Sequence, residues 1–409
     1  MAGPEILKVV ATAADILLRN GQTTAWTEEL VEGLARRFGY EASLLFRWGE
    51  LRVRLDRGDE QLKVLLPTVP MGIDMNKVAL VSEAVEDLRA DVSTLQQRLD
   101  EITALPPAGV VRFGLMAAAG AAALSVIFGI AHPSNLLLVA ASAGAGGWLR
   151  RMLGARTANP FVQPFAAAFL AGLIAGFAPR FEPTTAQHLL AVCPCMVLVP
   201  GPHFLNAFID LSRGRIPLGA SRLAFALLVV VAIGAGLLAG LSFGGVTLPA
   251  TSPTPPIAFG LDVIAAGIAV AAFGTFFSMP WRLLPIPIAI GMLAHGARWF
   301  VMTKFGANAP ESALLTCLIV GSLVSPISER LRVPFAAFGF AAVVSLIPGV
   351  LLFRMMSGIV ETATAGSDID IGTLSGVVAD GSTAVLVLGA MALGLGIPRL
   401  LLHSAAKDH

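Results

Sequence analysis

The chain has 409 residues, of which 56% are apolar and only 13% are charged. A soluble domain is typically about one quarter charged, so this composition excludes a wholly soluble protein, and the net charge of +1 argues against nucleic acid as a partner. The charges gather near the start, since residues 1–108 hold 12 of the 28 Lys and Arg residues and 17 of the 27 Asp and Glu residues. We therefore expect a soluble domain over residues 1–108 and a membrane region after it.

The pattern of the first region predicts a small α+β domain. An amphipathic helix over 5–20 and a second helix ending near Phe38 are followed by a hairpin within 43–55, a third strand over 61–69 and one long helix over 75–105. The region contains no phosphate-binding glycine loop, metal-ligand cluster or nucleophile motif. We expect a structural, regulatory or assembly role, or a part in gating a substrate path. The apolar face of the long helix would either pair between subunits of a homo-oligomer or cover the strands of its own domain.

Ten apolar segments follow, and a helix of about 20 apolar residues crosses a bilayer. The predicted spans are 109–131, 134–149, 161–178, 187–209, 219–243, 257–278, 285–303, 312–327, 335–354 and 382–402. The loops on the side of the N-terminal domain carry twelve Lys and Arg residues, Arg222 among them, and the opposite loops carry four. The positive-inside rule then places both termini in the cytoplasm, so we expect a multi-pass protein of the cell membrane.

The spans form two groups of five, over 109–243 and 257–403, separated by a loop over 244–256 that is rich in Gly, Pro, Ser and Thr. The fourth span of each group contains a Pro-Gly pair, Pro200-Gly201 and Pro348-Gly349. An odd number of spans per group gives the two halves opposite topology. Inverted repeats with paired broken helices are typical of secondary transporters, which bind substrate near the midplane between the repeats.

Polar residues within apolar spans mark function by default, because they are costly there. Asn206 and Asp210 lie four residues apart on one face of the helix after the first break. Asp210 is either a proton or substrate-amine site or an interfacial partner of Arg213. His203 either titrates near neutral pH or bonds a carbonyl that the break leaves free.

The second half carries four further candidates for substrate binding or coupling. Asp262 opens the sixth span, and His295 and Arg298 lie three residues apart in the seventh. Arg354 stands 148 residues after Asn206, at the corresponding place of the second half. It would meet an anionic group or extend to the outer headgroups. No set of these residues has the geometry of a hydrolase, a redox site or a metal site, so we expect neither an enzyme nor a cofactor.

The stretch from Val199 to Gly214, VPGPHFLNAFIDLSRG, resembles the signature of the threonine/serine exporter family, and the run LLRNGQTTAWTEEL from Leu17 resembles the opening of that family. Of the family's pattern, Pro200, Gly201, Asn206 and Asp210 are matched. The resemblance implies a cytoplasmic region, ten helices in two halves, and efflux of small hydroxy amino acids driven by the proton gradient.

We therefore expect a secondary exporter of threonine or serine that works as a proton antiporter. The two Pro-Gly breaks would offer backbone groups to the substrate, and Asp210 would supply the amine contact or the exchangeable proton. Two alternatives stay open: an exporter of small dicarboxylates such as succinate, built around Arg298 and Arg354, and a receptor or scaffold that transports nothing and has no continuous cavity between its halves. The expected partners are the small-molecule substrate, protons and membrane lipid.

Overall fold

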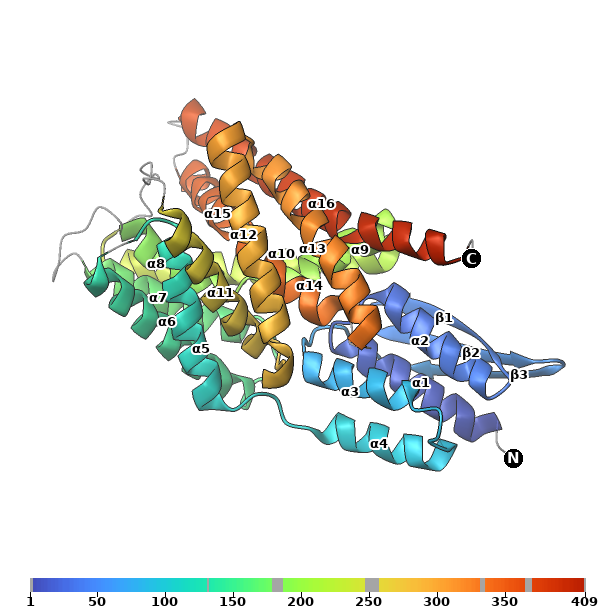
Figure 1. Ribbon diagram of the computed structural model, residues 1–409. Coiled ribbons are helices and arrows are strands. Elements are labelled where there is room, and N and C mark those ends of the chain that lie inside the picture. The colour runs from blue at the N-terminus through green and yellow to red at the C-terminus, as the bar shows by residue number, and fades with distance from the viewer. Residues whose placement is uncertain are drawn as a thin grey trace.

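The computed structural model describes residues 3–130, 132–178, 187–246, 257–331, 335–364 and 370–407. Most of the predicted loop over 244–256 lies outside the described residues. Figure 1 shows a small N-terminal domain of helices and strands at one end of a larger bundle of helices. The C-terminal end of α16 (Ile371–Lys407) reaches the same end of the bundle.

The N-terminal region over residues 1–108, called the soluble domain below, has the predicted α+β composition. Its elements in chain order are α1 (Gly3–Arg19), α2 (Thr24–Arg37), β1 (Glu41–Arg47), β2 (Glu50–Arg57), β3 (Glu60–Leu66), α3 (Met75–Glu86) and α4 (Val92–Ala104). The three strands form an antiparallel sheet in the order β1-β2-β3, with Leu44 opposite Val53 and Val53 opposite Val64. The apolar face of α1 is the centre of this domain, because α2, α3, α4 and the sheet all pack against it.

The prediction of one continuous helix over 75–105 is wrong, because residues 87–91 separate α3 from α4. Asp91 begins α4 by accepting a hydrogen bond from the Thr94 N–H, as an N-cap residue does. Arg37 fixes the turn by donating to the carbonyl oxygen of Asp87 at 2.8 Å. Leu95 and Leu99 are fully buried in α4, which packs on α1. The apolar face therefore covers another helix of its own domain, rather than the strands.

The membrane region follows the predicted order. The first half comprises α5 (Val110–Ile127), α6 (Pro133–Gly154), α7 (Val162–Phe177), α8 (Gln187–Met196), α9 (Gly201–Ser212) and α10 (Ile216–Phe243). The second half comprises α11 (Phe259–Phe276), η2 (Trp281–Leu283), α12 (Pro285–Phe305), α13 (Ala309–Leu331), α14 (Phe335–Val343), η3 (Val344–Leu346), α15 (Gly349–Thr364) and α16.

Six single helices are long and apolar enough to cross a bilayer, and the bent pairs α8–α9 and α14–α15 bring the number of such spans to eight within the described residues. The predicted spans at α6 and α7 remain predictions. The 16 residues of α7 extend about 24 Å at 1.5 Å per residue, which is less than the bilayer core of about 30 Å. Large apolar side chains are exposed on the outer faces of the bundle, including Leu115, Leu137, Leu228 and Leu386, as a lipid-facing surface requires.

Helices α7 and α10 pack backbone to backbone through glycines, as close-packed membrane helices do. A Cβ atom on Gly240 would overlap the carbonyl oxygen of Phe169, and one on Gly236 would overlap that of Phe165. We expect Gly240→Ala to lower the free energy of unfolding by about 1–3 kcal/mol, the usual cost of overpacking. Denaturant titration of the purified protein in detergent would measure this loss. Gly396→Ala is the control, because nothing lies within 4 Å of a Cβ there, and an unchanged Gly240→Ala protein would contradict the close packing.

Candidate functional site

Both Pro-Gly pairs break a helix, as predicted. The axes of α8 and α9 meet at 63°, and those of the second pair meet at 55°. The local hydrogen bonding is the same at both breaks: the N–H of Gly201 donates to the Val199 carbonyl and that of Gly349 to the Ile347 carbonyl, each at 2.8 Å. Because Pro200 and Pro348 have no N–H to continue a helix, each of the two helices breaks at its proline.

The two breaks pack against each other. A Cβ atom on Gly201 would overlap the side chain of Ile347, and one on Gly349 would lie 3.4 Å from Met196 and 3.6 Å from Val199. Beyond the breaks, α9 packs on α10 and α16, while α15 packs on α16 and α10. The breaks thus lie where the two halves of the membrane region meet.

A cavity of about 410 Å³ lies beside the first break. Its wall includes residues 197–200, Pro202 and His203 of the broken helix, Arg150 of α6, Gln163 and Pro164 of α7, Phe225 and Val229 of α10, Phe273, Phe276 and Phe277 at the end of α11, and Met71, Gly72 and Ile73 of the soluble domain. The cavity therefore borders both halves of the membrane region and is covered by the soluble domain. Its volume is in the range of small-molecule sites.

The polar groups of this cavity are few. Arg150 is the only charged residue among the described ones that line it, and no acidic side chain of the described residues pairs with it. Val197 and Leu198 also line the cavity, and no donor among the described residues bonds to the carbonyl oxygen of either. The N–H groups of Gly201 and His203 at the break already donate hydrogen bonds to backbone carbonyl oxygens. The cavity thus offers a cation, two free acceptors and the side chains of Gln163 and His203.

His203 is buried at the cavity wall. Its ring packs edge-on against Phe225 with 5.1 Å between the ring centroids, and Met71 of the soluble domain lines the same cavity. Both predicted roles of His203, titration near neutral pH and bonding to a carbonyl at the break, stay predictions.

Asp210 and Asn206 face the soluble domain rather than the cavity. Asp210 accepts hydrogen bonds from Arg222 of α10 and from the Thr24 hydroxyl, both at 2.5 Å, and the Asp210 and Arg222 side chains are each only 1% exposed. Asn206 donates to the Gly21 carbonyl oxygen at 3.0 Å. The partner of Asp210 is therefore Arg222 and not Arg213, the partner that one of its two predicted roles gave it. Arg222 was also counted among the loop residues, and the structure places it within α10.

Further contacts hold the soluble domain against the bundle. The Met75 N–H donates to the Phe277 carbonyl at 2.7 Å, and Glu28 pairs with Arg215 at the start of α10. Asp74 caps α3 through the N–H groups of Asn76 and Lys77, and burial at this junction raises the pKa of its carboxyl group above the usual range. The segment 71–73, directly before Asp74, covers the cavity.

The four candidates of the second half lie outside the cavity. His295 Nδ1 is 2.9 Å from Asp262 Oδ2, and both side chains are buried. Arg298 interacts electrostatically with Asp262. Arg354 pairs with Asp380 at 3.0 Å. Neither Arg298 nor Arg354 lines the cavity at the first break, and Arg354 already has an acidic partner.

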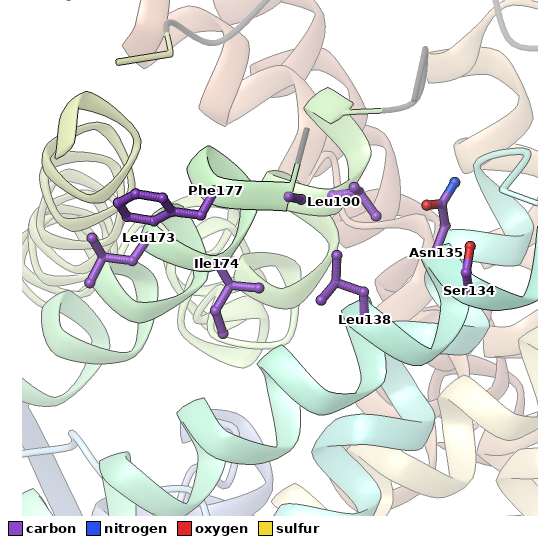
Figure 2. Close-up of a pocket in the computed structure, with 8 residues that line it drawn as sticks. Ser134, Asn135, Leu138, Leu173, Ile174, Phe177 and Leu190 are labelled. Carbon is purple, nitrogen blue, oxygen red and sulfur yellow. The ribbon is translucent and has the colours of Figure 1, made fainter. Parts of the chain in front are cut away.

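A second, larger cavity of about 570 Å³ lies between α6, α7 and α8 (Figure 2). Its lining is formed by Ser134, Asn135, Leu138, Leu173, Ile174, Phe177, Ala178 and Leu190. Of these described lining residues only Ser134 and Asn135 are polar, and Figure 2 shows both at one side of a mostly apolar space. Because charged and polar substrates need placed partners, the smaller cavity at the break is the better candidate site.

Sequence reasoning missed Arg150 and Arg222 as site residues. Both were read as basic residues of cytoplasmic loops, although each follows or interrupts an apolar run in which a charge is costly. The spacing of twelve residues between Asp210 and Arg222 spans a helix end, a turn and a new helix, so periodicity within one helix could not pair them.

Comparison with known families supplies a separate finding. Residues 8–244 match the family described as "Putative threonine/serine exporter", and residues 262–401 match a second family described as "Threonine/Serine exporter, ThrE". Together these two matches cover both halves of the membrane region and nearly all of the soluble domain. No solved structure matches the chain.

Proposed function

Because the chain belongs to the threonine/serine exporter family, we propose that it exports threonine, serine or a similarly small hydroxy amino acid through the cavity at the first helix break. Family membership and the apolar helices make it a multi-pass membrane protein with a small-molecule substrate. They also point to transport rather than catalysis.

The polar groups of the cavity support a zwitterionic substrate. The guanidinium of Arg150 matches a carboxylate, which it binds with two parallel hydrogen bonds. The free carbonyl oxygens of Val197 and Leu198 match an ammonium group, and Gln163 and His203 are near enough to the same space to meet a hydroxyl. Among the described lining residues there is one cation, no acid and two residues with unbonded carbonyl oxygens, and this is the observation that carries the proposal.

The alternative of a small dicarboxylate is less well supported. A dianion would need a second cation, and Arg150 is the only one among the described lining residues. Arg298 and Arg354 were the residues expected to serve it, and neither of them lines this cavity. The alternative of a scaffold without transport predicts no continuous cavity between the halves, and the cavity at the break, which borders both halves, favours transport over it.

We propose alternating access by two inverted repeats. Corresponding helices make corresponding contacts in the two halves: the third packs on the fifth as α7 on α10 and as α13 on α16, and the first packs on the second as α5 on α6 and as α11 on α12. The contact between the two breaks supports a substrate site at the repeat interface. The second cavity, on the α8 side, would then belong to the route toward the opposite surface.

The orientation follows the distribution of basic residues. Without Arg150 and Arg222, ten Lys and Arg residues against four still favour a cytoplasmic soluble domain and a cytoplasmic C-terminus. The soluble domain would then cover the cavity from the cytoplasm, which is the side from which an exporter takes its substrate. We propose proton antiport in the cell membrane as the source of energy.

Counterflow in proteoliposomes tests the function. Vesicles loaded with unlabelled threonine, serine or succinate would receive the same labelled compound outside, and empty vesicles would be the control. We expect exchange of labelled threonine or serine and none of succinate. Exchange of succinate alone would contradict the amino-acid proposal, and the absence of exchange for all three compounds would contradict the exporter proposal.

A further inference from the structure

The second half of the membrane region contains a buried cluster of titratable groups that the substrate cavity does not use. Asp262 lies in the first turn of α11, and His295 of α12 contacts it at 2.9 Å. The His295 side chain is 1% exposed and that of Asp262 is 7% exposed. Arg298, almost one turn after His295, balances the charge of Asp262. With a neutral imidazole the cluster carries no net charge.

One polar atom of this cluster has no partner. His295 Nε2 is buried, and no group of the described residues makes a hydrogen bond to it. Because an ionised carboxylate can only accept, Nδ1 carries the proton shared with Asp262, and Nε2 is left as an open lone pair. Leaving a buried polar atom unsatisfied is costly. An added proton would occupy this lone pair while the Nδ1–H bond to Asp262 is kept.

The surroundings of His295 contain few other titratable groups. Asp262 is the only such residue of α11, and α14 has none. On α13, Glu311 accepts from the Asn308 N–H in an exposed turn, Cys317 is buried, and Glu329 and Arg330 are near the other end of the helix. Arg282 of η2 pairs with Glu83 of the soluble domain. Lys304 is in the last turn of α12. Within the described residues, Asp262 and Arg298 are thus the charges that face His295.

We propose that the Asp262–His295 pair binds the coupling proton of the exporter, at a site separate from the substrate cavity. This inference rests on the proposed function. Imidazole is the side chain whose charge changes most readily near neutral pH, and ionisable groups inside a membrane commonly serve as proton relays. The pair lies toward the end of the bundle that faces away from the soluble domain, which is the side from which protons enter an antiporter.

Helix α11 connects the proton site with the substrate cavity. Asp262 is in its first turn, and Phe273 and Phe276 near its other end line the cavity. The 11 residues from Asp262 to Phe273 span about 16 Å of helix at 1.5 Å per residue. A change of charge at Asp262 and His295 acts on the position of α11 against α12, and this rigid helix transmits the change to the cavity wall.

The test compares two measurements on His295→Gln and Asp262→Asn in proteoliposomes. Counterflow of labelled serine without a gradient reports exchange, and accumulation of labelled serine under an imposed pH gradient reports coupling. We expect both variants to keep counterflow within about twofold of the unmodified protein and to lose gradient-driven accumulation at least tenfold. His132→Gln is the matched control, since His132 is exposed at the start of α6, and it should keep both activities.

Three outcomes would overturn the inference. Gradient-driven accumulation that is unchanged in both variants would show that the pair carries no coupling proton. Loss of counterflow in variants that elute from size-exclusion chromatography like the unmodified protein would show that the pair serves substrate movement itself. If the unmodified protein shows counterflow but no gradient-driven accumulation, the proton site is overturned and the exporter proposal stands. If it shows no counterflow at all, the exporter proposal itself is overturned.

Discussion

Replacing Arg150 by alanine is expected to raise the threonine or serine concentration for half-maximal counterflow by about 10- to 100-fold. Arg150 is the only charged group among the described lining residues of the cavity, so no neighbour replaces its contact to a substrate carboxylate. A hydrogen bond to a charged group contributes about 1.5–3 kcal/mol, and each 1.4 kcal/mol is a factor of ten in affinity. The measurement is the initial rate of counterflow as a function of substrate concentration.

Two further variants sharpen this prediction. Arg156→Ala removes an exposed basic residue just after the end of α6 and should leave the half-maximal concentration unchanged. Arg150→Lys keeps the charge and loses the paired geometry of the guanidinium, so it should fall between the alanine variant and the unmodified protein. An unchanged half-maximal substrate concentration in the Arg150→Ala protein would contradict the contact between Arg150 and the substrate carboxylate.

The second large effect is expected at the buried ion pair between α9 and α10. Replacing either Asp210 or Arg222 by alanine leaves the other charge buried without its partner, which costs about 3–5 kcal/mol of the free energy of unfolding. The double replacement removes both charges and should cost clearly less than the sum of the two single replacements. Denaturant titration in detergent measures all three free energies of unfolding. Limited proteolysis reports in parallel whether the soluble domain has become more accessible to protease.

The pair between Arg354 and Asp380 provides the comparison for this experiment. The Arg354 side chain is 37% exposed, and partly exposed ion pairs contribute at most about 1 kcal/mol, so Arg354→Ala should have a small effect. Additive losses for Asp210→Ala and Arg222→Ala would contradict a direct interaction. We infer from the buried pair and the Thr24 hydroxyl that Asp210 anchors the soluble domain to the bundle, rather than receiving the substrate amine.

The elements that could be predicted from the sequence are those set by local pattern. Continuous apolar runs predicted the helices of the membrane region, and the alternation after Ser43 predicted the hairpin of β1 and β2. Pro200 and Pro348 predicted both helix breaks, because a proline cannot donate the bond that continues a helix. Local periodicity also predicted the order of helices and strands in the soluble domain, apart from the turn at 87–91.

The features that escaped prediction depend on contacts between distant segments. The turn at 87–91 is fixed by Arg37, which lies 50 residues away in the chain from Asp87. Asp210 meets Thr24 across 186 residues, so its anchoring role could not be seen from the helix on which it lies. The cavity combines parts of six helices with the segment 71–73. Arg150 became a site residue only when the fold placed it beside the first break.

The most direct test of the central claim is an experimental structure of the protein with threonine bound in a lipid nanodisc. The account predicts threonine in the cavity at the first break, with its carboxylate beside Arg150 and its ammonium group beside the carbonyl oxygens of Val197 and Leu198. Threonine bound instead in the cavity between α6, α7 and α8 (Figure 2), or beside Asp210 with the soluble domain displaced, would contradict it.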